Sequence, residues 1–417
     1  MDLLKTFFEK DRWVTAIEIA RQKEIDTSLL RKLLTPEYRL ELYRMIRDGK
    51  YTIEPPHEAQ IPKDDGTFRT VYVNEPLDRV LLSIYNDMIF ELCSDMVHPT
   101  CTSYQKGIGC GKVVTKVSKT IRHMKPGVIG KKVDLSKYFD SVPIRYIDEI
   151  FDRIDNTLGK SAITDTVRRY YHTNTVIDIN KNTIEKYSSL RQGCAFAAFL
   201  ADAVLYDIDD AISALDVCYV RYSDDILIIG DEWEKGYKIL KQALSEKTLI
   251  LNPKKVETLY KDKWFKFLGF TLRNNKISLS KPRIKSFQKE IEDRTIRSAT
   301  TNIDEIIRSV NDYLYIGDGK YSWTTSVLPI INVKRDIQTL DNFVMDAIRA
   351  GSTERTRIGG LGCVTDGDYT IKRGTGRNVK ANKLRYPYLN RYQRMTCMKT
   401  AFVINRDVYE QVILSTL

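Results

Sequence analysis

The sequence contains no apolar run that approaches the roughly 20 residues needed to cross a bilayer. It also begins without a recognisable secretory signal peptide, and its seven cysteines include no Cys-x-x-Cys pair. An odd number of cysteines without such a signal is typical of reduced, buried thiols in a cytosolic protein. We find no internal repeat and no low-complexity tract. These absences argue against a membrane protein and against a disulfide-stabilised secreted domain, so we expect a cytoplasmic protein without membrane contact.

Positive charge, by contrast, is plentiful. Lys and Arg number 66 against 55 Asp and Glu, which gives a formal net charge of +11. The 417 residues, 42% of them hydrophobic, predict a globular protein of two or three domains. The excess of cations suggests an anionic partner, although many basic proteins have none.

The C-terminal part has the most uneven charge. Residues 351–417 hold 12 Lys and Arg against five Asp and Glu, and residues 371–400 hold nine cations and no acid. Tyrosines are interleaved with these cations, a composition suited to single-stranded or structured RNA, where cations contact phosphates and aromatic rings stack on bases. A disordered basic tail is the alternative. The candidate RNA-binding residues are Lys372, Arg373, Arg377, Lys380, Lys383, Arg385, Tyr386, Tyr388, Arg391 and Arg394.

A pair of adjacent carboxylates marks the middle of the chain. Two apolar, β-branched runs flank Tyr222-Ser223-Asp224-Asp225, which predicts a β-hairpin with both aspartates at its tip. Adjacent carboxylates repel each other, so a cation should compensate them, and a hard divalent metal ion with oxygen ligands is the natural candidate. An acidic surface turn is the alternative.

A third carboxylate stands upstream at Asp134, where a strand is predicted to end and to lead into a helix at about 144–154. A carboxylate at a strand end is held rigidly at the edge of a sheet. If Asp134 faces Asp224 and Asp225, the three can hold two divalent ions, about 3.5–4 Å apart, that assist an in-line displacement. Nucleotidyl transfer requires such a site and little covalent chemistry from the protein.

Residues 59–73 predict a hairpin, with Asp65-Gly66 as its turn. Lys63 and Arg69 would lie on its two arms, where a point charge and a forked guanidinium suit a triphosphate. Ordinary surface cations on a solvated hairpin are the alternative.

A glycine-rich stretch at 103–112 invites comparison with a phosphate-binding P-loop. Its glycines are too closely spaced, and Val113 stands where Ser or Thr would bind Mg²⁺. We therefore expect either a flexible loop able to approach a sugar–phosphate backbone or a plain structural loop.

These stretches, taken in order, resemble the motifs of reverse transcriptases over roughly residues 40–280. The resemblance implies an α+β fold: a right-hand polymerase with fingers, an antiparallel-sheet palm and a helical thumb. It also implies RNA-templated synthesis of a DNA product from deoxynucleotides with two Mg²⁺ ions. The matching stretches are 61–73 (finger strands), 133–142 (motif A), Gln192-Gly193 (motif B), 222–225 (motif C), 251–255 (motif D) and 267–270 (motif E).

Helical spacing, composition and the resemblance, which covers only about residues 40–280, together predict a division of the chain into five parts. They are an N-terminal helical segment at 1–50, fingers at 51–125, a palm at 126–280 with a fingers segment at about 155–190, a helical thumb at 281–350 and a basic RNA-binding part at 351–417.

It also implies a role for each matching residue, with a surface lysine as the alternative for the general acid. The metal ligands would be Asp134, Asp224 and Asp225, with the Leu135 carbonyl nearby, and Lys255 would protonate the leaving pyrophosphate. Lys63 and Arg69 would contact the triphosphate, and Gln192 and Gly193 would position nucleotide and template. The primer would be gripped by Phe267, Leu268 and Gly269.

Phe139, five residues after Asp134, matches the family's aromatic steric gate. A ring beneath the incoming sugar would clash with a 2′-hydroxyl and favour deoxynucleotides. RNA-templated RNA polymerases place an aspartate at this spacing, and Asp140 lies one residue too late. A core aromatic is the alternative for Phe139.

Motif B departs from the usual Leu-Pro-Gln-Gly followed by Ser-Pro. Arg191 replaces the first proline, and Ala197-Ala198 replaces the Ser-Pro pair, which leaves template handling and fidelity open. No integrase, protease, RNase H or HNH-like stretch is visible. This pattern most resembles the bacterial defence-associated reverse transcriptases of the unknown group, and within it the type 2 anti-phage class, with retron and diversity-generating enzymes as close rivals.

That class implies a structured noncoding RNA as partner and template. Two other functions stay open: a template-independent or protein-primed DNA polymerase of abortive-infection type, and a maturase-like RNA-binding protein. The sequence does not indicate an oligomeric state.

Overall fold

The computed structural model describes residues 2–353 apart from 23, 24, 26, 64, 65, 106, 188 and 317–321, and in addition the short strands at 365–366 and 369–370. The chain forms two compact units. The first comprises Met1–Gln105 and Gly130–Thr258, and the second comprises Lys106–Ile129 and Leu259–Leu417. None of the described helices is long and apolar enough to span a membrane.

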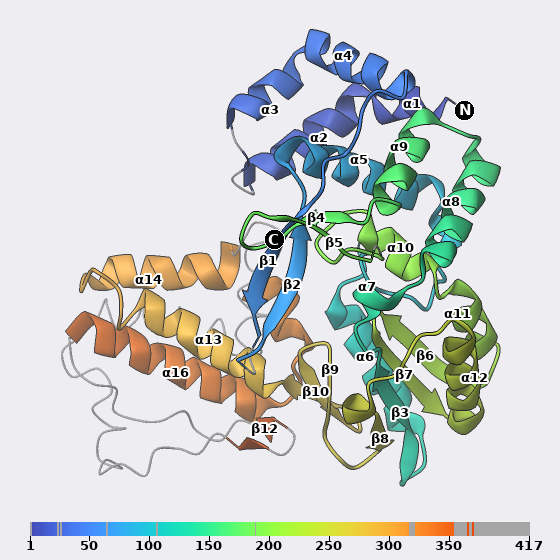
Figure 1. Ribbon diagram of the computed structural model, residues 1–417. Helices are drawn as coiled ribbons and strands as arrows, with labels where there is room; N and C mark the ends of the chain where they lie inside the picture. The colour runs from blue at the N-terminus through green and yellow to red at the C-terminus, as the bar shows by residue number, and fades with distance from the viewer. Residues whose placement is uncertain are drawn as a thin grey trace, which may run out of the picture. The chain divides into compact units, whose positions relative to one another are not determined.

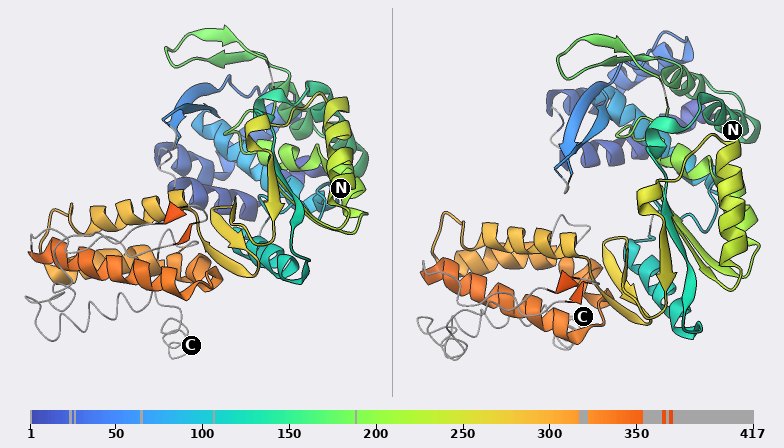
Figure 2. Two further views of the ribbon diagram at one scale, coloured as in Figure 1. Left: turned by 90° about the horizontal axis from the view of Figure 1, so that it is seen from below. Right: turned by 60° about the horizontal axis from the view of Figure 1, so that its bottom comes forward.

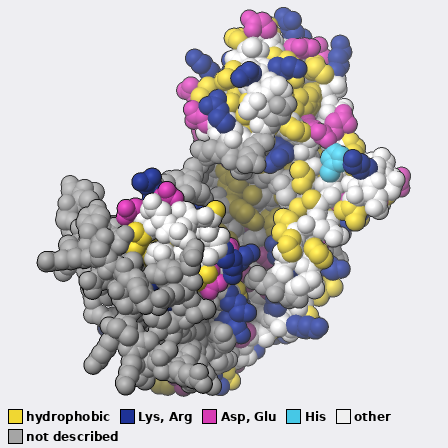
Figure 3. Space-filling view, turned by 90° about the vertical axis from the view of Figure 1, so that its left-hand side faces the viewer, with side chains coloured by type: hydrophobic (Ala, Val, Ile, Leu, Met, Phe, Trp, Pro, Cys, Tyr) yellow, Lys and Arg dark blue, Asp and Glu magenta, His cyan; other side chains and the backbone are white. Residues whose placement is uncertain are grey.

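The first unit begins with four helices. Thr35-Pro36 predicts the entry of a helix, a cap followed by a first-turn proline, and the structure has this helix. Thr35 is its N-cap, Pro36 begins it, and the chain leaves it through Asp48 and Gly49, which has φ +68°. Leu42 and Ile46 bury its inner face. The upper part of Figure 3 shows cationic, acidic and hydrophobic side chains interspersed on the surface. The four helices are α1 (Leu3–Phe7), α2 (Lys10–Gln22), α3 (Thr27–Leu34) and α4 (Pro36–Arg47).

The predicted hairpin at 59–73 is also present, as β1 (His57–Pro62) and β2 (Phe68–Val73). The sequence of residues 176–184 also predicts a hairpin, around an Asn-rich turn. The structure forms it from β4 (Thr175–Ile177) and β5 (Thr183–Glu185), a green two-stranded ribbon in Figure 2. The four strands make one sheet in the order β2-β1-β4-β5, and all its pairings are antiparallel except β1 with β4.

Aromatic side chains fill the core beside this sheet. Phe196 is central: its ring lies 4.8 Å from that of Tyr85 and 5.7 Å from those of Phe151 and Phe199. All four are fully buried. The helices that carry or adjoin them are α5 (Pro76–Leu92), α8 (Ile144–Leu158), α9 (Ala162–Tyr171) and α10 (Ala197–Ala203).

A second four-stranded sheet, ordered β6-β7-β3-β8, carries the candidate site. Two helices, α11 (Tyr206–Ser213) and α12 (Trp233–Glu246), lie along one face of it in Figure 1. The sequence pattern predicts one regular helix from Phe196 to Ile212, and this prediction is wrong: Val204 and Leu205 separate α10 from α11. The strands are β3 (Val128–Asp134), β6 (Val217–Tyr222), β7 (Asp225–Gly230) and β8 (Glu257–Tyr260).

Gly130 allows β3 and β7 to pair closely. It lies opposite Ile229, and a Cβ on it would stand 2.0 Å from the carbonyl oxygen of Ile228. No rotation of a flexible side chain relieves a clash with backbone, so only glycine fits this position.

The second unit contains a three-stranded antiparallel sheet, ordered β11-β10-β9, and a set of helices. The spacing of apolar residues after 280 predicts helices with a break near 298–302. The structure has both, since the first helix ends at Arg294 and Asn302 caps the next one. The same spacing puts Ile296 on the first helix, but it lies beyond that helix and is 42% exposed. The elements are α6 (Cys110–His123), β9 (Phe265–Phe267), β10 (Phe270–Arg273), β11 (Lys276–Leu279), α13 (Lys281–Arg294), α14 (Ile303–Asn311), α15 (Trp323–Ser326), α16 (Lys334–Thr353), β12 (Thr365–Asp366) and β13 (Tyr369–Thr370).

The glycine-rich stretch at 103–112 is shorter as a loop than predicted, since α6 begins at Cys110. Gly111 lies inside this helix, where a Cβ would stand 2.1 Å from the Cδ1 atom of Ile330. The glycine therefore permits close helix packing rather than contact with a ligand.

Candidate active site

The adjacent aspartates lie at the tip of a tight hairpin, as predicted. β6 and β7 pair in register from Val217 with Gly230 to Tyr222 with Asp225, so Ser223 and Asp224 alone form the turn. Ser223 has φ +56°, the left-handed conformation that two-residue hairpin turns require.

Asp134 meets this tip across the neighbouring strand. It is the last residue of β3 and lies directly opposite Asp225 in the antiparallel β3–β7 register. The next residue continues the contact, because the Leu135 amide donates to the Asp224 carbonyl at 3.2 Å. Three carboxylates from two distant segments therefore gather at one end of the sheet.

Burial and nearby negative charge raise the pKa values of the two aspartates at the hairpin tip. Burial, and next to it the negative charge of Asp134, raises the pKa of Asp224 to about 6. The pKa of Asp225 is also raised, again chiefly by burial, although Lys132 opposes the shift. The site thus carries negative charge that its own cations balance only in part.

Lys255 supplies the nearest positive charge. Its Nζ donates to Asp134 Oδ2 at 2.7 Å. Burial works against the ammonium, but the hydrogen bond and the three aspartates raise the pKa of Lys255 overall. Motif D and motif A therefore meet in this structure through a direct ion pair.

The donor chemistry of the three aspartates suits hard divalent cations, which prefer carboxylate and carbonyl oxygens. Within the described ranges, however, no group of three or more Asp, Glu, His or Cys side chains is gathered as a metal site. Lys255 instead engages one oxygen of Asp134. Because burial and next the charge of Asp134 raise the pKa of Asp224, an additional cation beside it would favour its charged form.

A buried ion pair supports the hairpin from beneath. Arg221, in β6, is completely buried and donates through Nη2 to Asp209 Oδ2 at 2.6 Å and through Nε to Asp209 Oδ1 at 2.8 Å. Tyr219 donates its hydroxyl proton to the same carboxylate at 2.7 Å. A buried charge is tolerated only when it is paired and hydrogen-bonded in this way.

Ser103 links a second buried carboxylate to the turn itself. Its hydroxyl donates to Asp202 Oδ1 at 2.5 Å and accepts the Ser223 amide proton at 2.9 Å. The segment before it adds to the edge of β6, since the Arg221 amide donates to the Thr100 carbonyl at 3.0 Å. The conformation of the turn that bears Asp224 thus depends on a hydroxyl 120 residues upstream of Ser223.

The sequence interpretation missed Ser103, Asp202, Asp209 and Arg221. A usable signal was present: Arg221 interrupts an apolar strand, and Asp202 and Asp209 interrupt the apolar helical pattern of 196–212. Charges at core positions require partners, so they predict a buried network, although not its location.

The motif B residues lie between the finger strands and the steric-gate candidate. The Gln192 carbonyl accepts the Tyr72 amide proton at 2.7 Å, and the Leu190 amide donates to the Phe139 carbonyl at 3.1 Å. Gly193 has φ +109°, and a Cβ on it would stand 2.5 Å from the Tyr72 carbonyl oxygen. The first unit therefore holds Phe139, Gln192 and Gly193 in one hydrogen-bonded arrangement.

Arg191, which replaces the usual proline, has a structural role here. It is buried with φ +59°, its guanidinium lies 4.3 Å from the centre of the Tyr170 ring, and it donates to the Thr173 carbonyl. Proline cannot adopt a positive φ, so this form of the turn excludes it.

Lys63 and Arg69 lie on opposite arms of the β1–β2 hairpin, as expected. Arg69 pairs with Ile61, and the Lys63 amide donates to the Thr67 carbonyl at 2.8 Å. Residues opposite each other share a face, and so do residues two apart on one strand, so both cations lie on the face of Ile61. Both are exposed.

The primer-grip candidates lie in the second unit. Leu268 and Gly269 form the two-residue turn between β9 and β10, with φ values of +49° and +78°, and Phe267 is buried at the end of β9. All ten candidate RNA-binding residues of 372–394 fall outside the described residues.

Solved structures similar to this chain include a partial Cas6-RT-Cas1–Cas2 complex, at 20% identity and a TM-score of 0.36 over 59% of this chain and 42% of that one. Telomerase from Candida albicans matches at 11% identity and a TM-score of 0.39, over 78% and 64% of the two chains. Apo telomerase from Candida tropicalis matches at 11% identity and a TM-score of 0.45, over 86% of this chain and 62% of that one. The chain thus spans less than two thirds of each of these proteins.

None of the curated proteins matches this sequence. The family described as "Reverse transcriptase (RNA-dependent DNA polymerase)" matches residues 61–272, which include every motif from the finger strands to the primer grip. This match and the observed α+β architecture confirm the predicted fold class and enzyme family. The chain belongs to the reverse transcriptase family.

Proposed function

We propose that this chain is an RNA-directed DNA polymerase whose catalytic centre is Asp134, Asp224 and Asp225. The observation that carries the proposal is the β3–β7 register, which puts Asp134 opposite Asp225, together with the bond from Leu135 to Asp224. Two Mg²⁺ ions held by these carboxylates and the Leu135 carbonyl would activate the attacking oxygen and stabilise the leaving one.

The chain's own residues would orient the nucleotide. Lys63 and Arg69, exposed on one face of the finger hairpin, suit a triphosphate because one supplies an ammonium and the other a forked guanidinium. Phe139, fixed through its carbonyl by Leu190, suits a gate beneath the sugar that excludes a 2′-hydroxyl.

Lys255 is proposed as the proton donor to the leaving pyrophosphate. Its ammonium lies on Asp134 and its pKa is raised, so the proton resides on Nζ at neutral pH. To act on pyrophosphate, the side chain must leave Asp134, and its half-exposed position permits this.

The template proposal is a structured noncoding RNA, copied in bacterial anti-phage defence. Its support is the basic, tyrosine-containing sequence of 371–400 and the altered motif B. Untemplated or protein-primed synthesis is the rival, and sequencing of the nucleic acid that co-purifies with the protein separates the two.

The test of the polymerase proposal is Asp224→Ala with Asp225→Ala. DNA synthesis on a primed RNA template should disappear, whereas affinity for RNA should change little, because neither carboxylate is expected to contact RNA. A host defence phenotype that survives this double change would instead support an RNA-binding protein of maturase type.

A further inference from the structure

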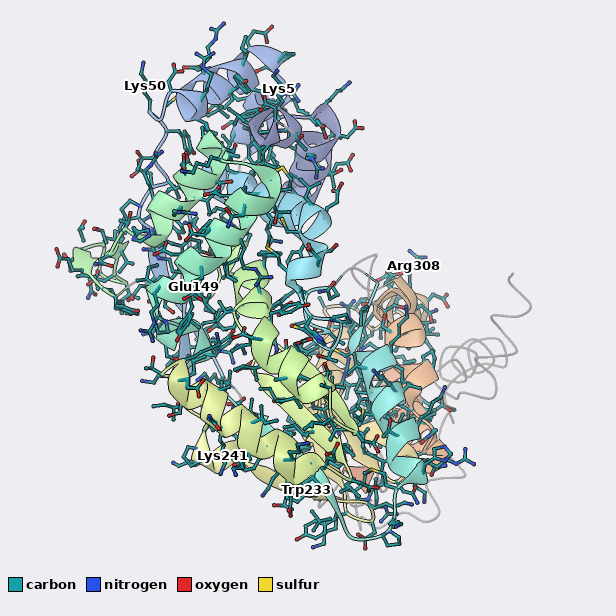
Figure 4. All side chains as sticks on the ribbon, turned by 90° about the vertical axis from the view of Figure 1, so that its right-hand side faces the viewer. Lys5, Lys50, Glu149, Trp233, Lys241 and Arg308 are labelled. Carbon is teal, nitrogen blue, oxygen red and sulfur yellow. The ribbon has the colours of Figure 1, made fainter. Side chains whose placement is uncertain are left out.

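The longest acid-free stretch of the described chain contains helix α6. Residues 96–133 include eight Lys and Arg and no Asp or Glu. Such runs often form a solvated surface, so the arrangement of the cations decides whether they form a site. Helix α6, pale turquoise in Figure 4, carries four of them.

The helix has two contrasting faces. Val113, Val114, Val117 and Ile121 are 0–3% exposed, and they pack the helix within the second unit, where it contacts β10 and β11. On the opposite side stand Lys112, Lys116 and Lys119, at spacings of four and three residues, with Arg122 beside them. All four of these cations are exposed.

These cations lack compensating acids. In the described part of the chain none of the four forms an ion pair, and only Lys112 makes a side-chain hydrogen bond, to the uncharged Gly107 carbonyl. The same stretch shows that pairing was available elsewhere, since Lys132 reaches Glu257 at 3.6 Å. Like charges three or four residues apart on a helix destabilise it, a cost that an external polyanion removes.

Hydrogen bonds from Lys261 hold the C-terminal end of helix α6 in place. Lys261 donates to the carbonyls of Arg122 and Met124, so a cation satisfies acceptors that the helix leaves free. The row from Lys112 to Arg122 extends over about 15 Å, at 1.5 Å per residue.

We propose that this basic face of α6 (Lys112, Lys116, Lys119 and Arg122) binds the phosphate backbone of a nucleic-acid duplex. A straight row of cations matches a regular row of phosphates, which contribute affinity without sequence preference. The exposed face carries no Phe, Tyr or Trp between positions 110 and 123, so it lacks the large stacking surfaces that hold unpaired bases. This surface is distinct from the carboxylate site and does not depend on the proposed polymerase activity.

The test is the salt dependence of binding for Lys116→Gln, Lys119→Gln and Arg122→Gln combined. Lys112 is kept because it bonds Gly107. Each phosphate contact contributes about −0.9 to the slope of log affinity against log salt, so the slope should become shallower by about 2.7. Between 50 and 200 mM salt the wild type should then lose about 40-fold more affinity than the variant. A 20-base-pair RNA duplex and the equivalent DNA duplex are the probes, and they identify which duplex the face prefers.

A matched control is available on α12, which like α6 has 14 residues. Lys235→Gln, Lys238→Gln and Lys241→Gln remove the same charge from a helix that also carries acids. Gln is a good helix former, and a circular dichroism spectrum equal to that of the wild type shows that each variant folds. The α12 variant should keep the wild-type slope.

Three outcomes would overturn the proposal: unchanged slopes for both duplexes, an equal change in the α12 variant, or an equal change for single-stranded RNA of the same length. Extension of a short primed template by the wild type is measured alongside, because a variant that binds the duplex less tightly also extends it less. A shallower slope in the α6 variant together with no extension by the wild type would support this surface and refute the polymerase; extension by the wild type together with an unchanged slope in the variant would do the reverse.

Discussion

Replacing Ser103 by alanine tests whether the buried network positions the catalytic turn. The change removes one hydroxyl that serves both Asp202 and the Ser223 amide. Each buried group left without a partner costs about 1–3 kcal/mol. Because both groups lose the same hydroxyl, the two costs do not simply add, and the free energy of unfolding should fall by about 3 kcal/mol. Because Ser223 precedes Asp224, the turn should also move. A misplacement of about 1 Å at a reacting centre costs about 100-fold in rate, which we expect in kcat.

The control is Ser278→Ala, which also removes a buried serine hydroxyl bonded to a buried aspartate, Asp336. Both variants should lose stability, measured by urea denaturation, but Ser278→Ala should retain kcat within about twofold. Single-nucleotide incorporation on a primed template, below the unfolding temperatures of both variants, gives kcat and KM. If Ser103→Ala loses stability but keeps kcat, the network only packs the core and the reasoning is refuted.

Four further outcomes are expected. In metal-free buffer, the Asp224 pKa of about 6 means that the folded protein binds more protons than the unfolded chain between about pH 4 and 6. The free energy of unfolding should therefore fall by up to about 3 kcal/mol as pH rises through this window. Asp224→Asn should remove that fall in urea titrations, and an unchanged pH dependence would contradict the raised pKa. Phe139→Ala should raise the ratio of ribonucleotide to deoxynucleotide kcat/KM at least tenfold, about 1.4 kcal/mol, and an unaltered ratio would leave it as a packing residue. Gly193→Ala should impair folding or activity severely, because its Cβ would clash with the Tyr72 carbonyl; wild-type melting and kcat would show that the turn can shift. Lys255→Met should lower kcat by about 10²–10⁴-fold and remove the basic limb of its pH profile, whereas a lower affinity alone would argue against proton transfer.

Local patterns predicted much of this molecule. The hairpins at 59–73 and 217–230, the strand that ends at Asp134 and the helix after Thr35 depend on alternation, turn residues and capping within a few positions. The structure also brings Asp134 to Asp225. This contact could be predicted from the family resemblance, because periodicity alone does not say which strands pair.

The features that sequence reasoning missed depend on contacts between distant segments. Ser103 lies 99 residues from Asp202 and 120 from Ser223, and no local pattern encodes such a contact. The break between α10 and α11 was missed for a related reason: the residues on both sides are buried, and a continuous apolar period does not reveal a bend.

The close approach at Gly130 gives the active site a geometric dependence on a residue with no chemistry of its own. Four positions separate it from Asp134 along β3, and a side chain there would press on the backbone of β7. The strand would relieve that pressure by sliding or separating, and a slip of one position would turn Asp134 to the opposite face of the sheet. Thermostabilising programmes that replace glycines by alanine should therefore spare this one, and an inactive but folded enzyme is the expected penalty where they do not.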